Sequence, residues 1–244
     1  MLNFVWVPGW SYTADIFQHT IDRLDSTFGP QNHIPIDFSD CTDAESLPKA
    51  LTEKLRLTEG KTVVTGWSLG AMVTQKVLES RPDMAELIFL VSTSPAFIQS
   101  DAYPDGISAK ELAALKKLLS RNPRKTVTSF RCSLYTEPER QEYLFKKGHE
   151  SEIPPIKSLL AGLDFLARYA IDDTASAAVS SPLYLLHGEL DGLCNPNAVS
   201  TLCNIYQNAR LERAKNLGHD ILFVAPHLLS DKIISVVSER DFIS

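Results

Sequence analysis

Short apolar runs alternate along the first part of the chain with turns and with a stretch of helical period. Leu2 to Val7 is followed by the turn Pro8 to Trp10. Thr62 to Thr65 leads through a glycine-containing turn into Ala71 to Glu79, which has helical period, and Leu87 to Val91 is a third apolar run. This alternation predicts an α/β protein with a mostly parallel central sheet flanked by helices.

The C-terminal part of the chain returns to the same pattern. Leu183 to Leu186 predicts a further strand, which leads into the turn His187 to Gly192. Leu211 to Asn216 precedes a loop that contains Gly218-His219, and Pro226 to Val237 predicts a terminal helix. The two ends of the chain are therefore expected to build one core.

The middle of the chain has a different pattern. Helical period replaces the short β-branched runs, and prolines interrupt it at Pro104, Pro123, Pro138, Pro154 and Pro155. This predicts an inserted helical lid at residues 96–175. Residues 1–95 and 176–244 would then form a discontinuous core.

The composition fits a single globular unit. The chain has 244 residues, of which 44% are hydrophobic and 22% are charged, enough to bury a large core. Its apolar runs are much shorter than the roughly 20 residues that span a bilayer, so we expect no membrane segment. The first residues lack the basic region and the cleavage site of a secretory signal. We therefore expect a cytoplasmic protein, and we expect it to be a monomer.

Charge and cysteine content argue against two kinds of function, general nucleic-acid binding and metal binding. A net charge of −6 argues against general nucleic-acid binding. Residues 110–157 nevertheless hold 11 Lys or Arg against 6 Asp or Glu, which fits either a binding surface or an ordinary solvated helical face. The four cysteines form no CxxC pair and no Cys/His ligand pattern, so we expect free thiols and no metal site.

The segment Gly66 to Gly70 fits the pattern GxSxG, with Ser68 at its centre. It lies between a predicted strand and a predicted helix, which is the context in which this motif holds a nucleophilic serine on a sharp turn. The flanking glycines leave room for that turn, and the helix that follows places its positive dipole end near the reacting oxygen.

A serine nucleophile needs a base to take its proton and a carboxylate to orient that base. The order Ser, Asp, His along the chain is met by Ser68, Asp191 and His219. Taken alone, Asp191 could be a turn residue and His219 a loop residue, but the three together favour catalysis. Asp220 is a weaker alternative for the acid, and His187 is expected to have a structural role.

The oxyanion of an ester-hydrolysis intermediate needs two N–H donors. They are expected from the backbone of Leu69, directly after the nucleophile, and of Trp10, in the loop after the first strand. Pro8 stands where many hydrolases carry histidine, although only the backbone donor is required. Together these features predict an α/β-hydrolase fold. The reaction of such a triad is expected to need no cofactor.

Four segments resemble the pimeloyl-[acyl-carrier protein] methyl ester esterases. They are Gly66 to Ala71 (GWSLGA), Ser92 to Pro95 (STSP), Leu190 to Leu193 (LDGL) and the Gly218-His219 loop. The resemblance implies a serine carboxylesterase that cleaves the methyl ester of a pimeloyl chain carried on acyl carrier protein. Enzymes of that family release methanol and end chain elongation for biotin synthesis, so the resemblance implies the same reaction here.

The resemblance also implies binding residues. Arg124, Lys125 and Arg140 would contact the acidic carrier protein, whereas two further arginines of the family are replaced here by Ser129 and Leu144. The substrate would be bound by Trp10, Ser68, Leu69, Phe130, Arg131, Cys132, Ser133, Leu134 and His219.

Two other functions stay open. A general short-acyl carboxylesterase or thioesterase would use the same triad on small-molecule esters, and the basic lid would then be only a solvated face. A non-catalytic receptor or interaction module on the same fold would leave the triad idle.

Overall fold

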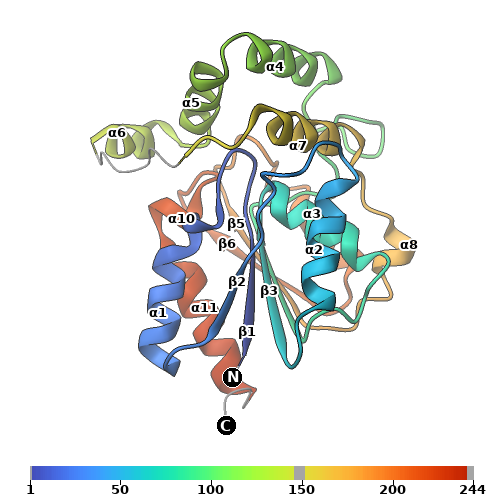
Figure 1. Ribbon diagram of the computed structural model, residues 1–244, viewed down its shortest axis with the longest axis vertical. Coiled ribbons are helices and arrows are strands. Elements are labelled where there is room, and N and C mark those ends of the chain that lie inside the picture. Colours follow the sequence, from blue (N-terminus) through green and yellow to red (C-terminus); the bar gives the residue numbers. More distant parts are fainter. Residues whose placement is uncertain (1, 146–151, 241–244) are drawn as a thin grey trace.

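The computed structural model describes residues 2–145 and 152–240, and its centre is one sheet of six parallel strands (Figure 1). Their order across the sheet is β2-β1-β3-β4-β5-β6. The predicted parallel sheet is therefore confirmed. The strands are β1 (Asn3–Val7), β2 (Asn32–Pro35), β3 (Thr62–Trp67), β4 (Leu87–Val91), β5 (Leu183–Gly188) and β6 (Ala209–Ala214).

The apolar pattern does not predict strand β2. Its sequence is NHIP, and only Ile34 is buried, because the strand lies at an edge of the sheet. Strands β1, β3 and β4 are instead buried over their whole length. Both faces of these inner strands are covered, so they read as continuous apolar runs that sequence patterns detect easily.

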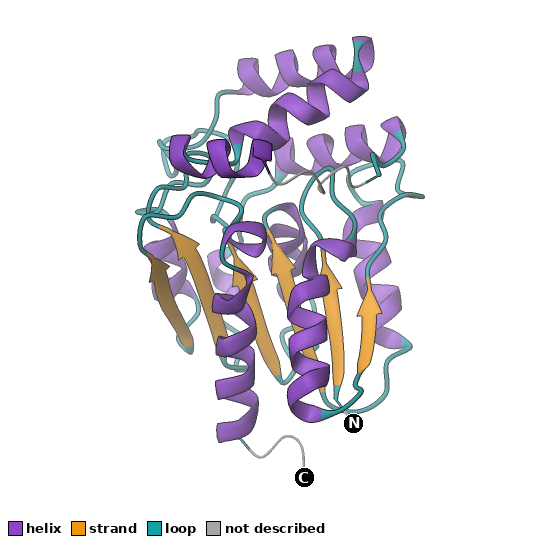
Figure 2. Cartoon of the chain, turned by 90° about the vertical axis from the view of Figure 1, so that its left-hand side faces the viewer, coloured by secondary structure: helices purple, strands orange, loops and turns teal. Residues whose placement is uncertain are grey.

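Helices cover both faces of the sheet (Figures 1 and 2). On one face, Leu24 and Ile233 pack in one core cluster with Phe4 of β1. On the other face, Leu47 and Met72 belong to a second core cluster. The helices of the first face are α1 (Gln18–Phe28) and α11 (Pro226–Glu239); those of the second are α2 (Ser46–Arg56), α3 (Leu69–Leu78) and α9 (Val199–Ile205).

The segment between β4 and β5 is helical, as its period predicts, and lies above the carboxyl ends of the strands (Figures 1 and 2). Helix α4 begins with a capping box of Ser108 and Glu111, and α5 begins at Pro123 after the cap Asn122. The lid helices are α4 (Ala109–Arg121), α5 (Pro123–Ser133), α6 (Glu137–Phe145) and α7 (Ile156–Arg168). The division of the chain at residues 96 and 175 stays a prediction.

Short elements complete the chain. They are a 3-10 helix at Ala14–Phe17, α8 (Asp173–Ser176) and α10 (Ile221–Val224). None of the helices in the described ranges combines the length and the apolar character needed to cross a bilayer.

Close packing of α3 against β1 makes Gly70 a sensitive position. A Cβ atom there would collide with the carbonyl oxygens of Val7 and Pro8. We expect Gly70→Ala to lower the free energy of unfolding by about 3 kcal/mol, because backbone cannot yield as a side chain does. Denaturant titration measures this change. Gly192→Ala is the control, since its Cβ would meet nothing within 4 Å. Equal unfolding midpoints for both variants would contradict the packing argument.

Candidate active site

Ser68 lies on a sharp turn between β3 and α3. Its φ is 54° and its ψ is −119°, a conformation that costs energy for any residue with a Cβ. The turn is tight because Gly66 lets the strand approach the helix, where a Cβ would lie 2.7 Å from Ala71 Cα. Ser68 N–H donates to Val91 O at 2.9 Å, which ties the turn to β4. The GxSxG segment thus has the strand-turn-helix context that the motif requires.

The structure brings Ser68, Asp191 and His219 together. His219 Nε2 lies 2.8 Å from Ser68 Oγ, and His219 Nδ1 lies 2.8 Å from Asp191 Oδ2. The three side chains follow β3, β5 and β6, whose carboxyl ends meet at one edge of the sheet. Ser68 is 8% exposed, Asp191 4% and His219 1%, so water is largely excluded from the two hydrogen bonds.

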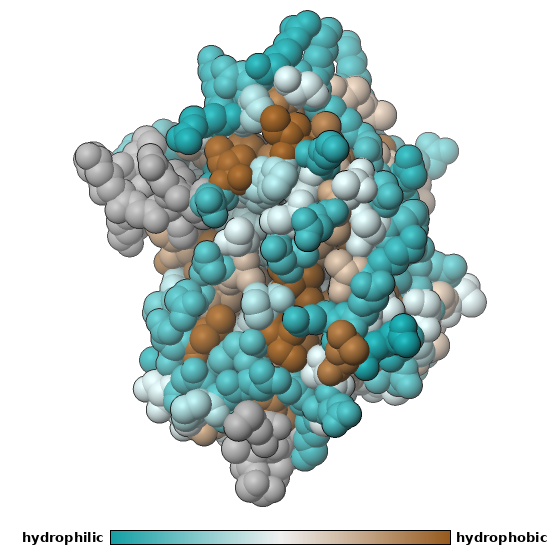
Figure 3. Space-filling model, viewed as in Figure 1, coloured by the Kyte–Doolittle hydropathy of each residue, from teal (hydrophilic) through white to brown (hydrophobic). Residues whose placement is uncertain are grey.

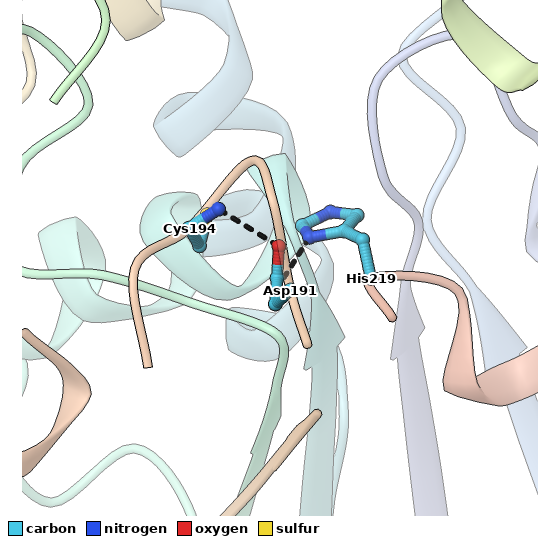
Figure 4. Close-up of side chains that lie close together, drawn as sticks. All are labelled: Asp191, Cys194 and His219. Carbon is cyan, nitrogen blue, oxygen red and sulfur yellow. Dashed lines mark hydrogen bonds and ion pairs between the residues drawn. The ribbon is translucent and has the colours of Figure 1, made fainter. Parts of the chain in front are cut away.

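The turn that follows β5 fixes the Asp191 carboxylate. Asp191 Oδ1 accepts from the backbone N–H groups of Leu193 and Cys194 at 2.8 and 2.9 Å. The other oxygen, Oδ2, faces His219, as Figure 4 shows, and also lies 3.3 Å from His187 Nε2. His187 is fully buried, and its Nε2 is 2.9 Å from Cys194 O. His187 therefore packs against the turn after β5 that carries Asp191, which we call the acid turn. This contact is in keeping with the structural role expected for His187.

These contacts shift the pKa values of the pair in opposite directions. Burial raises the pKa of Asp191, but the charge and hydrogen bond of His219, together with the charge of His187 and the N–H of Cys194, lower it below its ordinary value. Burial lowers the pKa of His219, and the charge and hydrogen bond of Asp191 raise it above its ordinary value. An ionised carboxylate only accepts, so Nδ1 of His219 carries a hydrogen. In the neutral imidazole, Nε2 is then free to accept the proton of Ser68.

Asp220, the weaker alternative for the acid, is bound elsewhere. Its Oδ2 accepts from Tyr135 Oη at 2.6 Å, and its Oδ1 accepts from Phe223 N–H at 3.2 Å. Burial raises the pKa of Asp220 to about 6, although the Tyr135 hydrogen bond lowers it. These contacts hold the carboxyl group in the cap of α10, while Asp191 occupies the position beside the imidazole.

The two expected oxyanion donors belong to the residue after Ser68 and to the loop after β1, which runs close to Ser68. Leu69 is the first residue of α3, so its N–H has no acceptor within the helix. Trp10 follows Gly9, where a Cβ would lie only 2.7 Å from Trp67 Cε3, so the β1 loop runs close to the nucleophile turn. The indole N–H of Trp10 donates to Leu159 O at 2.8 Å, which fixes this loop under α7.

The five consecutive residues expected to line the acyl site lie at the end of α5. Phe130 packs edge-on against the ring of Trp10, with centroids 4.7 Å apart. Leu134 is buried, whereas Ser133 is exposed and Cys132 is half-buried. Arg131 is buried as well, and its guanidinium contacts the loop after β1.

The residues expected to contact a carrier protein differ in their exposure and in their contacts within the lid. Arg124 and Lys125 are exposed at the start of α5. Arg140 is partly engaged within the lid, because Nη1 lies 3.2 Å from Glu137 Oε2 and Nε donates to Cys132 O at 3.3 Å. The first two side chains are therefore the more accessible ones.

Cys194 lies beside the acid and the imidazole (Figure 4). Possible ligand atoms of Asp191, Cys194 and His219 lie within 4.8 Å of one another, so the set could hold a metal ion. Burial raises the pKa of the Cys194 thiol, which opposes the thiolate form that metals bind. The Asp191 and His219 atoms are also hydrogen-bonded to each other. The arrangement thus fits orientation of the imidazole better than metal binding.

The raised pKa of His219 predicts the pH dependence of any reaction that needs its neutral form. Activity should fall on the acid side with a midpoint above pH 6.5, the ordinary pKa of histidine. Asp191→Asn should move that midpoint downward and lower kcat by about 10⁴-fold, because the imidazole loses its orienting acceptor. Profiles of kcat/KM against pH measure both effects. Asp231→Asn, in an exposed ion pair with Arg23, is the control, and an equal effect in both variants would contradict the assignment.

Known proteins share this fold and parts of this sequence. Residues 29–224 match the family described as serine aminopeptidase, S33. A pimeloyl-[acyl-carrier protein] methyl ester esterase of Yersinia enterocolitica is 29% identical over 83% of this chain and 80% of its own. The enzyme of the same name from Pectobacterium carotovorum is 27% identical over 96% of this chain and 93% of its own.

Solved structures agree on the architecture. A putative non-heme bromoperoxidase from Mycobacterium tuberculosis superposes with a TM-score of 0.80 at 12% identity, covering 100% of this chain and 94% of that one. An esterase from Exiguobacterium antarcticum gives 0.75 at 17% identity, covering 98% and 92%. Because the family match spans most of the chain, the protein belongs to the serine aminopeptidase S33 family of the α/β-hydrolase superfamily.

Proposed function

We propose that this protein is a serine carboxylesterase that hydrolyses the methyl ester of pimeloyl-acyl carrier protein. The observation that carries the proposal is the buried hydrogen-bond chain from Asp191 through His219 to Ser68. The substrate is supported by the relatives of that name, which match this chain over most of its length. The products are pimeloyl-acyl carrier protein and methanol.

The first half-reaction transfers the acyl group to Ser68. Ser68 Oγ attacks the ester carbonyl carbon while His219 Nε2 takes the hydroxyl proton. The carbonyl π electrons move onto the oxygen, and the backbone N–H groups of Leu69 and Trp10 stabilise that oxyanion. When the carbonyl re-forms, the bond to the methoxy oxygen breaks, and this oxygen receives the proton from His219 and leaves as methanol. The acid Asp191 stabilises the imidazolium throughout.

The second half-reaction restores the enzyme. Water attacks the acyl carbon and gives a proton to His219 Nε2, and a second oxyanion forms between Leu69 and Trp10. Its collapse breaks the bond to Ser68 Oγ, which recovers its proton from His219. These steps use only groups of the chain, water and the ester, so the proposal includes no cofactor.

The lid supplies the surfaces for the acyl chain and the carrier. Phe130, whose ring contacts that of Trp10, would supply apolar surface suited to methylene groups. Figure 3 shows apolar side chains gathered on the lid helices among hydrophilic ones. Arg124 and Lys125 present exposed positive charge, which an acidic carrier protein would meet by electrostatic attraction.

A general short-acyl carboxylesterase or thioesterase is the second candidate. The engagement of Arg140 with Glu137 favours it, since that charge is already partly satisfied inside the lid. A non-catalytic module is disfavoured, because burying an aligned Ser, His and Asp would cost energy without use. The three functions predict different rates of hydrolysis for free esters and for carrier-bound esters.

The nucleophile assignment predicts that Ser68→Ala lowers ester hydrolysis by at least about 10³-fold. The test compares pimeloyl-acyl carrier protein methyl ester with free p-nitrophenyl esters of graded length. A preference for the carrier-bound ester that depends on Ser68 supports the proposal. Rapid turnover of free short esters with the carrier substrate ignored would favour the general esterase, and full activity of Ser68→Ala would refute the mechanism.

Charge reversal at the start of α5 tests carrier recognition. The double variant Arg124→Glu/Lys125→Glu should raise KM for the carrier-bound ester by about tenfold, because like charges repel the acidic partner. Its kcat/KM for free p-nitrophenyl esters should stay within twofold. The matched control is Lys54→Glu/Arg56→Glu on α2, whose two side chains are also exposed. An identical effect of both double variants on the carrier substrate would point to net charge instead of a docking surface.

A further inference from the structure

The end of α5 and the start of α6, residues 131–140, contact both loops of the active site. One contact reaches the loop after β1, which carries Trp10, and another reaches the loop after β6, which carries His219. We call residues 131–140 the lid brace. Each of these two contacts is made by a buried charged side chain, Arg131 for the first loop and Glu139 for the second, which are 4% and 8% exposed.

Arg131 holds the loop after β1. Its Nε donates to Ser11 Oγ at 3.3 Å, and its Nη2 donates to the backbone carbonyl of Ser11. The guanidinium carbon also lies 4.5 Å from the ring centroid of Tyr12. Ser11 has a φ of 70°, a conformation that serine adopts only when its surroundings impose it. Arg131 thus fixes the residue next to Trp10, whose N–H is the proposed oxyanion donor.

Glu139 holds the loop after β6. Its Oε1 accepts the N–H of Gly218 at 2.9 Å, and its Oε2 accepts the N–H of Thr136 at 2.6 Å. The neighbouring peptide is held too, because His219 N–H donates to Leu134 O at 3.0 Å. Two consecutive backbone groups beside the imidazole are therefore bound by the lid brace.

A helix cap alone does not explain Glu139. Its bond to Thr136 completes a capping box at the start of α6, which a solvent-exposed glutamate can do equally well, as Glu111 does for α4. Burying a carboxylate is costly unless each oxygen is hydrogen-bonded. Within the described ranges, the second oxygen meets that need through the N–H of Gly218, in the loop that carries His219.

We propose that Arg131 and Glu139 are positioning residues, which hold the oxyanion loop and the histidine loop in register with Ser68. The proposal rests on the catalytic roles proposed above for Trp10 and His219. Glu139 acts through the backbone N–H groups of Thr136 and Gly218, and Arg131 acts through Ser11 and the ring of Tyr12. A shift of about 1 Å in catalytic groups can cost up to about 10²-fold in rate, so the lid brace controls turnover besides any role in binding.

The test measures kcat and KM separately on p-nitrophenyl butyrate, which has no carrier. Glu139→Ala should lower kcat by about tenfold and leave KM within twofold, because the imidazole is misplaced while the acyl site is kept. Glu111→Ala is the matched control, since it also removes a capping box of a lid helix, and the hydrogen bonds of Glu111 to described residues are all with Ser108. Its kcat should stay within twofold of the wild type.

A milder variant covers the case in which Glu139→Ala does not fold. Glu139→Gln keeps one acceptor oxygen for two N–H groups, and its kcat should lie between those of the wild type and Glu139→Ala. Arg131→Met tests the other contact, with about a tenfold lower kcat expected. Its control is Lys116→Met, which breaks a 2.6 Å ion pair with Asp164 between α4 and α7.

The outcomes separate this proposal from the proposed function. If Glu139→Gln and Arg131→Met both keep kcat within twofold while Ser68→Ala is inactive, the positioning roles are refuted and the triad stands. If equal losses of kcat occur in the two control variants, the effect is general lid stability, and the proposal is also overturned. If Ser68→Ala remains active, the triad itself is wrong.

Discussion

The hydrogen bond between Ser68 Oγ and His219 Nε2 joins groups that are 151 residues apart in the sequence. Its 2.8 Å length depends on three separate supports. The nucleophile turn holds Ser68 at a positive φ, the acid turn holds Asp191 against the imidazole, and the lid brace holds the backbone of His219. A shift in any one of them would separate the base from the proton that it is to remove.

The parallel sheet brings the loops that carry the three catalytic residues close together. The carboxyl ends of its strands lie along one edge, so the loops after β3, β5 and β6 meet without long connections. Further hydrogen bonds then tie the loops to one another. Ser92 Oγ donates to His219 O at 2.7 Å, and the indole N–H of Trp67 donates to the same oxygen at 3.3 Å. The imidazole is thus held from the core side as well as from the lid.

Much of the fold and the triad could be predicted from the sequence because their signals are local. The strand Leu87–Val91 is a continuous apolar run, and Ser68 stands in a glycine pattern that only a tight turn needs. Strand β2 was not predicted because a short, polar strand at the edge of a sheet has no apolar pattern in its sequence. The contacts of Glu139 and Arg131 with the active-site loops could not be predicted for another reason. Their partners lie 79 and 120 residues away in the sequence, and neither motif spacing nor helical period indicates contacts over such separations.

The most direct test of the central claim is covalent labelling of the native protein with a fluorophosphonate, followed by peptide mapping. Such reagents react with a serine whose hydroxyl is activated by a neighbouring base. The geometry predicts a single adduct on Ser68 in the wild type and labelling at least about 10²-fold slower in His219→Ala. An adduct on another serine, or an undiminished rate in His219→Ala, would contradict the assignment of Ser68 and His219 as nucleophile and base.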